Sequence, residues 1–193
     1  LIHDSFYRIS GAPLCAWDGW YVYPQRSGQA PYEMVIHYID FIQYLLGKPD
    51  QISAVGNERT DVHYSFLHTR MRYLTGLRVD AEAAWYNGPV PFSATYRAIF
   101  ERGVLDYNGS QLMLYRTGAS EGEKVNVAQK VSFASAINLP DAGPIYNEIA
   151  YFVDCVEKDV FPSVIKPKDS LESLHILLRA LESARDGRII SPV

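Results

Sequence analysis

The feature that most constrains the fold is a regular alternation of two kinds of residue in two neighbouring stretches of the sequence. The first set comprises Leu67, Thr69, Met71 and Tyr73 and then Val79, Ala81, Ala83 and Trp85. The second set, interleaved with the first, comprises His68, Arg70 and Arg72 and then Arg78, Asp80 and Glu82. A period of two places alternate side chains on opposite faces of a β-strand. The stretches therefore predict two strands of a sheet with one buried and one polar face.

Turn residues around these stretches extend the sheet in both directions. The turns at 101–103 and 108–109 separate three short runs at 94–100, 104–107 and 111–116, and residues 117–124 precede a further run at 125–133. Short Gly-containing turns join adjacent antiparallel strands. Residues 51–133 thus predict a mainly antiparallel open sheet of five or six strands, whereas residues 1–24 show no clear period and predict short strands and loops.

Three stretches have the period of a helix. Residues 32–46 end at Gly47 with Pro49 just beyond, which is a typical helix stop. Two more helices are predicted by the apolar positions Ile145, Ile149, Phe152 and Val156 and by Leu171, Leu174, Leu178 and Leu181. Strands in one block with helices at both ends indicate the α+β class. We expect one domain, residues 1–193, with helices packed on one face of the sheet.

Composition excludes several classes of partner. The formal net charge of −4 argues against nucleic acid, because phosphate binding needs clustered Lys and Arg. No apolar run approaches the roughly 20 residues that span a bilayer, and the first residues do not have the pattern of a signal peptide. Cys15 and Cys155 are far apart and favour two free thiols in a reducing compartment over a disulfide. We expect a cytoplasmic protein.

One polar stripe on the helix 32–46 is a candidate for chemistry. Glu33, His37, Asp40 and Tyr44 fall within about 60° of one another on a helical projection. A carboxylate four residues from a histidine holds its orientation and charge, which suits a general acid/base. The alternative is a solvated helix face. A metal site is disfavoured, because Glu33 and His37 supply only two ligands and no other His or Cys stands at metal-binding spacing.

No nucleotide-binding motif occurs in the sequence. It contains neither Gly-x-Gly-x-x-Gly after a strand nor Gly-x-x-x-x-Gly-Lys-Ser/Thr, and no Gly-x-Ser-x-Gly. We therefore expect no cofactor-binding residues within this chain.

Two segments together resemble a known family. Residues 27–40, followed by Leu-Leu-Gly-Lys-Pro at 45–49, resemble the helix of the glucose–fructose oxidoreductase / inositol dehydrogenase / MocA family. That family has a Gly-rich turn, an acidic residue, His four positions later, Asp three beyond and then Leu-Gly-x-Pro. Residues 147–174 and the Ser-Ala-Arg-Asp-Gly-Arg run at 183–188 resemble its closing helix pair. The likeness spans the whole chain, as the C-terminal half of such an enzyme.

The resemblance implies an NAD(P)-dependent oxidoreductase that acts on a sugar, cyclitol or related polyol by hydride transfer. An N-terminal Rossmann domain outside this chain would bind NAD or NADP, and the fragment alone would be inactive. His37 would be the acid/base and Glu33 the substrate carboxylate. Asp40, Tyr32 and Trp20 would bind substrate or support the residues that do.

The resemblance also implies a homo-oligomer assembled through the open sheet face. Aromatic residues on the strands suit such an interface or equally the packing of helices: they are Tyr73, Trp85, Tyr96, Tyr107 and Tyr115. The leading alternative function is a non-catalytic α+β binding or dimerisation module, and a weaker one is a hydrolase that uses the same domain with bound NAD.

Overall fold

The structure is a computed structural model that describes residues 1–11, 17–57, 64–86, 88–126, 143–164 and 166–192. Its contacts divide the chain into two units, one made of residues 1–125 and 171–193 and the other of residues 126–170. None of the helices in these ranges is both long and apolar enough to cross a membrane.

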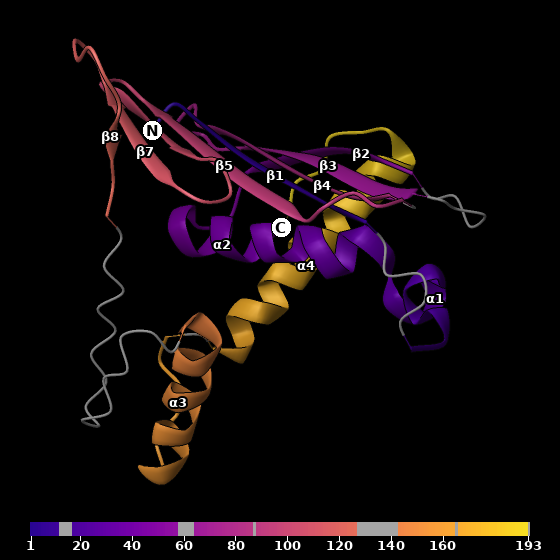
Figure 1. The fold of residues 1–193 in the computed structure, drawn as a ribbon. Coiled ribbons are helices and arrows are strands. Elements are labelled where there is room, and N and C mark those ends of the chain that lie inside the picture. The colour runs from indigo at the N-terminus through magenta and orange to yellow at the C-terminus, as the bar shows by residue number, and fades with distance from the viewer. Residues whose placement is uncertain (12–16, 58–63, 87, 127–142, 165, 193) are drawn as a thin grey trace. The chain divides into compact units, whose positions relative to one another are not determined.

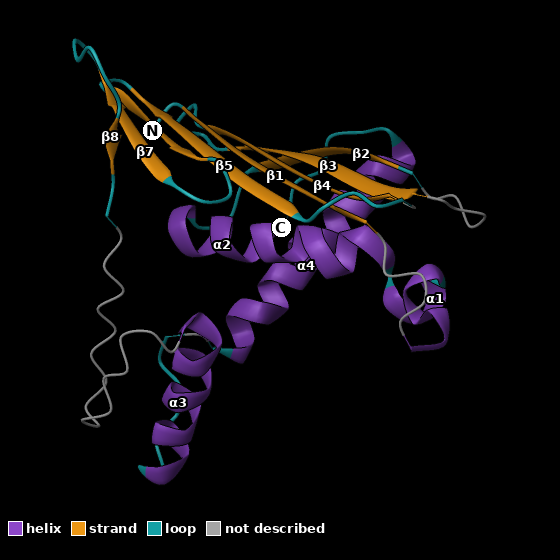
Figure 2. Ribbon diagram, in the orientation of Figure 1, coloured by secondary structure: helices purple, strands orange, loops and turns teal. Residues whose placement is uncertain are grey.

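The first unit is built on an eight-stranded sheet (Figures 1 and 2). The strands are β1 (His3–Gly11), β2 (Gln51–Gly56), β3 (Tyr64–Arg72), β4 (Arg78–Tyr86), β5 (Ser93–Phe100), β6 (Gly103–Tyr107), β7 (Leu112–Arg116) and β8 (Glu123–Lys124). Their order across the sheet is β2-β3-β4-β1-β5-β6-β7-β8. All neighbours are antiparallel except β1 and β4, which are parallel. The predicted α+β class and the mainly antiparallel open sheet are confirmed.

The position of β1 differs from the prediction for the N-terminal segment. It is a nine-residue strand, and it lies in the middle of the sheet between β4 and β5. Its side chains do not show a simple apolar alternation, because Asp4 and Arg8 share a face with Phe6. Those two charged residues hid a central strand from a period-based prediction.

Helices cover one face of this sheet. The π-helical turn η2 (Pro31–Val35) leads into α2 (Ile36–Leu46), and α4 (Pro167–Asp186) ends beside β2. Figures 1 and 2 show α2 and the C-terminal part of α4 on the same face. The core contains Val35, Ile39 and Ile42 from the covering helix, and Leu67, Met71, Val79 and Ala81 from the strands, all almost fully buried. The predicted alternation of β3 and β4 is thus confirmed, with the set that begins at Leu67 and Val79 facing the helices.

The aromatic residues of the strands divide between the two faces. Tyr73, Trp85 and Tyr96 belong to the helix-covered core or pack against it. Tyr107 pairs with Tyr96 and so shares its face, whereas Tyr115 lies on the open face through its pairing with Val104. Packing against helices therefore accounts for most of this set.

The predicted helix at the end of the chain is present as α4, but most of the leucines that indicated it are not on its buried face. Leu171, Leu174 and Leu178 are exposed, whereas Ser173, Ile176, Leu177, Ala180 and Ser183 are buried. Small residues allow the helix to approach the sheet closely. The Ser183 hydroxyl accepts a hydrogen bond from the Ala54 amide at 3.0 Å and donates one to the Arg188 carbonyl at 2.6 Å. This explains why Ser183 belongs to the closing motif.

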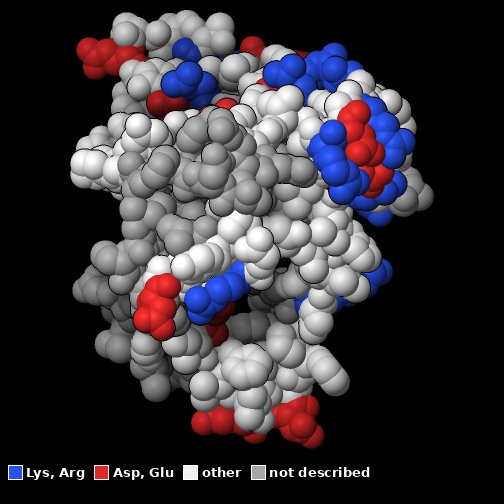
Figure 3. All heavy atoms as spheres, turned by 90° about the vertical axis from the view of Figure 1, so that its right-hand side faces the viewer, with Lys and Arg blue, Asp and Glu red and all other residues white. Residues whose placement is uncertain are grey.

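The end of α4 is rich in ion pairs. Arg188 pairs with Glu182 at 2.8 Å and with Asp186 at 3.2 Å, and Arg179 also pairs with Glu182. Figure 3 shows basic side chains gathered around acidic ones on the side of the molecule where α4 ends. Exposed pairs of this kind contribute little individually, and the mixture of signs leaves no basic patch there.

The second unit contains α3 (Gly143–Glu157) and the segment that leads into α4. The helix predicted from Ile145, Ile149, Phe152 and Val156 is present, but all four side chains are exposed. Cys155 is buried and free, while Cys15 and the strand predicted for 125–133 lie wholly or largely outside the described residues. That 1–193 forms one domain stays a prediction.

Candidate active site

The turn before the covering helix sets where that helix begins. The short helix α1 (Pro24–Ser27) ends at Gly28, whose φ is 70°, and Gln29 follows at 56°. Both values lie in the left-handed region, which glycine adopts freely and other residues rarely do. A Cβ on Gly28 would also come within 2.4 Å of the Tyr32 ring. The Ser27 hydroxyl accepts a hydrogen bond from the Gln29 amide at 3.0 Å and fixes the turn.

A π-helical turn carries the first residue of the polar stripe. The Ile36 amide donates to the Pro31 carbonyl five residues back, so Glu33 lies in a wider turn than the rest of the helix. Single π turns inside helices are frequent at functional sites. Glu33 is half-buried, and His37 lies one turn further on, at an exposed position of α2.

The charges around His37 act on its pKa in opposite directions. Partial burial of the ring lowers the pKa from 6.5, and the positive charge of Arg8 lowers it further. The carboxylates of Glu33 and Asp40 and the backbone of Glu33 raise it, with smaller effect. His37 is therefore a neutral imidazole at neutral pH, held between a cation and two carboxylates, which suits a base that accepts a proton.

Arg8 is the residue of this group that sequence reasoning missed. It extends from β1 on the covered face of the sheet, and its guanidinium carbon lies 4.7 Å from the centre of the Tyr38 ring. The Tyr38 hydroxyl donates to the Tyr7 carbonyl at 2.9 Å, which fixes that ring. The only signal in the sequence is an arginine in a segment without a readable period.

The other predicted stripe residues, Asp40 and Tyr44, have different surroundings from Glu33 and His37. The Ser173 hydroxyl lies 2.8 Å from an Asp40 carboxylate oxygen, so Asp40 joins α2 to α4. Tyr44 is 72% exposed, and for that residue the solvated-face interpretation holds. Along the stripe, Glu33 and Asp40 act on the pKa of His37, Asp40 also contacts α4, and Tyr44 lies in solvent.

The two predicted aromatic members lie closer to the preceding turn. Tyr32 is exposed, with its ring against Gly28. Trp20 lies in the short helix η1 (Trp17–Val22), where its carbonyl accepts a hydrogen bond from the Tyr23 amide at 3.3 Å. Their roles in binding stay predictions.

The helix N-termini of the described residues bear on the prediction that this chain holds no cofactor-binding residues. Phosphates bind at helix N-termini whose free amides follow a glycine-rich turn. Helices α1, α3 and α4 and the π-helical turn each carry a proline within their first two positions, and proline has no amide hydrogen: these are Pro24, Pro144, Pro167 and Pro31. Each of these N-termini therefore has one free amide fewer, and the absence of cofactor-binding residues from this chain stays a prediction.

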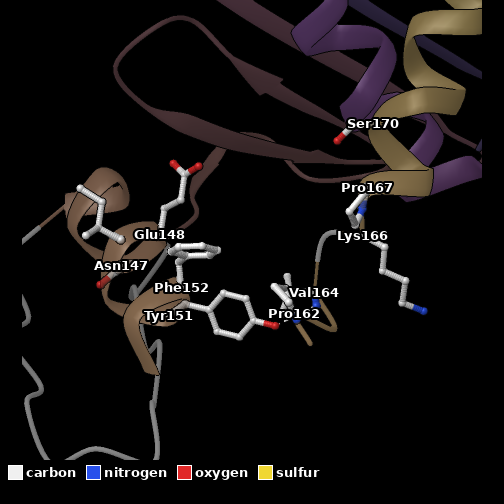
Figure 4. Close-up of a pocket in the computed structure, with 10 residues that line it drawn as sticks. Asn147, Glu148, Tyr151, Phe152, Pro162, Val164, Lys166, Pro167 and Ser170 are labelled. Atoms are coloured by element: carbon white, nitrogen blue, oxygen red, sulfur yellow. Dashed lines mark hydrogen bonds between the residues drawn. The ribbon is translucent and has the colours of Figure 1, made fainter. Parts of the chain in front are cut away.

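The second unit contains a large cavity of about 940 Å³ (Figure 4). Its wall is mostly apolar and includes Phe152, Pro162 and Val164. The Tyr151 hydroxyl points to the loop that closes it, accepting hydrogen bonds from the Ser163 amide at 2.6 Å and the Val164 amide at 3.1 Å. No histidine lines it. The coupled charges at His37 make the end of the covering helix the better candidate for proton transfer.

Comparison with known proteins places this architecture in a class. The chain has an open sheet covered by a helix that carries an acidic residue and a histidine. Its residues 2–106 match the family model described as the GFO/IDH/MocA C-terminal domain. The chain belongs to the GFO/IDH/MocA family. No curated protein matches it in sequence.

Solved structures share the fold at low sequence identity. Levoglucosan dehydrogenase, in complex with NADH and levoglucosan, is 16% identical with a TM-score of 0.73, over 98% of this chain and 58% of that one. An NAD binding oxidoreductase from Klebsiella pneumoniae is 15% identical with a TM-score of 0.75, over 100% of this chain and 59% of that one. An oxidoreductase from Agrobacterium radiobacter, in complex with NAD+, L-tartaric acid and magnesium, is 13% identical with a TM-score of 0.69, over 99% and 56%. The chain thus spans less than two thirds of their lengths.

Proposed function

We propose that this chain is the substrate-binding domain of an NAD(P)-dependent oxidoreductase that acts on a sugar, cyclitol or related polyol by hydride transfer. The observation that carries the proposal is the electrostatic coupling of Glu33 to His37 at one end of the covering helix, with Arg8 acting on the same imidazole. Structures of similar fold support it, because levoglucosan dehydrogenase is seen with NADH and levoglucosan and also with NADH and L-sorbose.

The chemistry assigned to this chain is proton transfer and orientation. Oxidation of a carbinol breaks its C–H and O–H bonds, removes a hydride and a proton, and leaves a carbonyl. His37 accepts the hydroxyl proton on a ring nitrogen, since its lowered pKa keeps it neutral beforehand. Glu33 accepts hydrogen bonds from further hydroxyls of the substrate. NAD or NADP, bound mainly by a nucleotide-binding domain outside this chain, is the hydride acceptor in this proposal.

His37→Ala in the whole enzyme tests the assignment. With the substrate found by screening sugars and polyols for NAD(P)+ reduction, we expect kcat to fall about 100-fold or more, the range for loss of a general acid/base. Thermal stability should change little, because His37 lies at an exposed position.

Tyr44→Ala is the matched control, because Tyr44 lies on the same stripe but in solvent. It should leave kcat unchanged. Glu33→Gln should raise KM and shift the pH–rate profile to lower pH, since it removes a charge that raises the pKa of His37. Near-full turnover by His37→Ala would contradict the proposal and favour the non-catalytic module.

A second candidate role is assembly through the open sheet face, in addition to or in place of catalysis. No described helix covers that face, and the apolar side chains of Val55 and Tyr115 are exposed on it. We propose that it contacts the same face of a second copy. Light scattering on the whole protein should give a dimer or larger, and a monomer at high concentration would refute this.

A further inference from the structure

Arg8 is a cation without a counter-ion on the covered face of the sheet. It is half-buried, makes no ion pair among the described residues, and its Nε atom is buried without a hydrogen-bond partner. Six other arginines form ion pairs with carboxylates: Arg70, Arg97, Arg116, Arg179, Arg185 and Arg188. Arg72, on the open face, also has a buried Nε atom without a partner, but Arg8 is the one that acts on His37. Removing a charge from water without a partner is costly, so the unpaired state of Arg8 needs an explanation.

Two aromatic rings hold the guanidinium in place. Its carbon lies 4.7 Å from the Tyr38 ring centre and 5.7 Å from that of Phe92. Cation–π contacts orient the planar group, which also acts on the Tyr38 hydroxyl through a hydrogen bond, and its Nε–H donor is buried without an acceptor. Tyr38 is also the residue after His37 on α2, so the clamp belongs to the same part of the helix as the proposed base.

The positive charge of Arg8 lowers the pKa of His37. Of the charged groups that act on the imidazole pKa, Arg8 has the largest effect, ahead of Glu33 and Asp40. A ligand that reaches His37 is therefore within the field of the guanidinium as well.

We propose that Arg8 binds an anionic group, a carboxylate or a phosphate, carried by the sugar or polyol whose hydroxyl His37 deprotonates. This inference rests on the proposed function and narrows its substrate class to acidic sugars. The guanidinium fork matches a pair of anionic oxygens, which lysine or a neutral donor does not do equally well. Arg8 thereby positions the substrate, and the anionic group of the substrate compensates the charge of Arg8.

The test compares three probes on the whole enzyme: D-glucose, D-gluconate and D-glucose 6-phosphate, with a matched galactose series. Each is assayed for NAD(P)+ reduction and for binding by calorimetry. We expect an anionic member to exceed its neutral parent in affinity and in kcat/KM by about 10- to 100-fold, the range for charge-assisted hydrogen bonds. Preference for gluconate identifies a carboxylate, and preference for glucose 6-phosphate a phosphate.

Variants at Arg8 then assign the preference. Arg8→Gln should abolish it, mainly through KM, and leave the neutral sugar within about threefold, whereas Arg8→Lys should keep part of it. Arg102→Gln is the control, because Arg102 is exposed in the turn between β5 and β6 and forms no ion pair in the described chain. If Arg8→Gln does not fold, Arg8→Lys alone decides, since it keeps the charge but loses the fork.

Two outcomes overturn the inference: equal or better binding of the neutral sugar by the wild type, or an anion preference that survives Arg8→Gln. Failure of the proposed function looks different. If His37→Ala retains turnover, or no probe is oxidised, the binding arm still shows whether Arg8 selects the anion.

Discussion

The two faces of the sheet differ in how their charged side chains are paired. On the open face, Asp80 is surrounded by His3, His68 and Arg70, and these contacts hold the pKa of its carboxyl well below the usual range. On the covered face, Asp4 and Arg8 lie two strand positions on either side of Phe6, and both have buried polar atoms without partners. Charged residues of the open face are thus mostly paired, with the Nε of Arg72 as an exception, whereas Asp4 and Arg8 of the covered face form no ion pair in the described chain.

The buried carboxyl of Asp4 shows how burial without an ion pair changes a pKa. Asp4 is 1% exposed, and burial raises the pKa of its carboxyl to about 6, although the Ser5 backbone and the Tyr96 hydroxyl moderate the shift. Ionising this group in the folded protein is therefore unfavourable. The covered face gains its stability from apolar packing and tolerates these two charges.

The largest expected effect concerns that apolar packing. Ile39→Ala should cost about 2–5 kcal/mol of unfolding free energy, since Ile39 is almost fully buried on the face of α2 away from His37. Thermal or urea unfolding measures it.

Val55→Ala is the comparison on the open face, where Val55 is 61% exposed. With the protein kept monomeric by dilution, it should change stability by less than about 0.5 kcal/mol. An equal loss at both positions under that condition would remove the contrast.

The next effect depends on pH. Asp4→Asn should stabilise the protein by about 3 kcal/mol above pH 6, because it removes a carboxylate whose pKa is raised from 3.8 to about 6. The folded state binds the proton more tightly than the unfolded state. The penalty is therefore absent below about pH 4, grows as pH rises to about 6, and is constant above it.

Asp80→Asn should do the reverse. The pKa of Asp80 is lowered, so its contribution is present at neutral pH and is lost in acid. We expect a loss of about 1–3 kcal/mol at pH 7. Unfolding measured from pH 4 to 8 would contradict the account if the two variants shifted stability in the same direction.

A smaller effect concerns the turn that positions the covering helix. Gly28→Ala should cost about 1–3 kcal/mol, because its φ of 70° disfavours a side chain and the new Cβ would meet the Tyr32 ring. Gln29→Gly should change stability by less than about 1 kcal/mol, since relief at a φ of 56° offsets the greater freedom of the unfolded chain. Calorimetric unfolding of both variants checks this, and a larger loss in Gln29→Gly would show that its side chain holds the turn.

Much of the fold could be predicted because its signals are local. The alternation in β3 and β4, the turn at Asn108–Gly109 and the stop at Gly47 depend on neighbouring residues, and all three are present in the structure. The leucines of α4 predicted the helix but do not mark its buried face, since Leu171, Leu174 and Leu178 are exposed. The small residues Ser173, Ala180 and Ser183 are buried instead, where the helix lies close to its neighbours. The sequence pattern of the helix alone does not reveal which element packs against them.

The candidate site shows the same division. Glu33 and His37 were predicted from their spacing along one helix, and their electrostatic coupling agrees with that spacing. Arg8 comes from a strand 29 positions earlier, and only the fold brings it to Tyr38 and His37. Residues that meet across elements could not be found from periodicity.

The most direct test of the central claim, that Arg8, Glu33 and His37 form one coupled reacting group, is an NMR titration of the His37 imidazole in the whole protein. We predict a pKa below 6.5 in the wild type, a higher value in Arg8→Gln and a lower value in Glu33→Gln. A His37 pKa that stays the same in both variants would contradict the account.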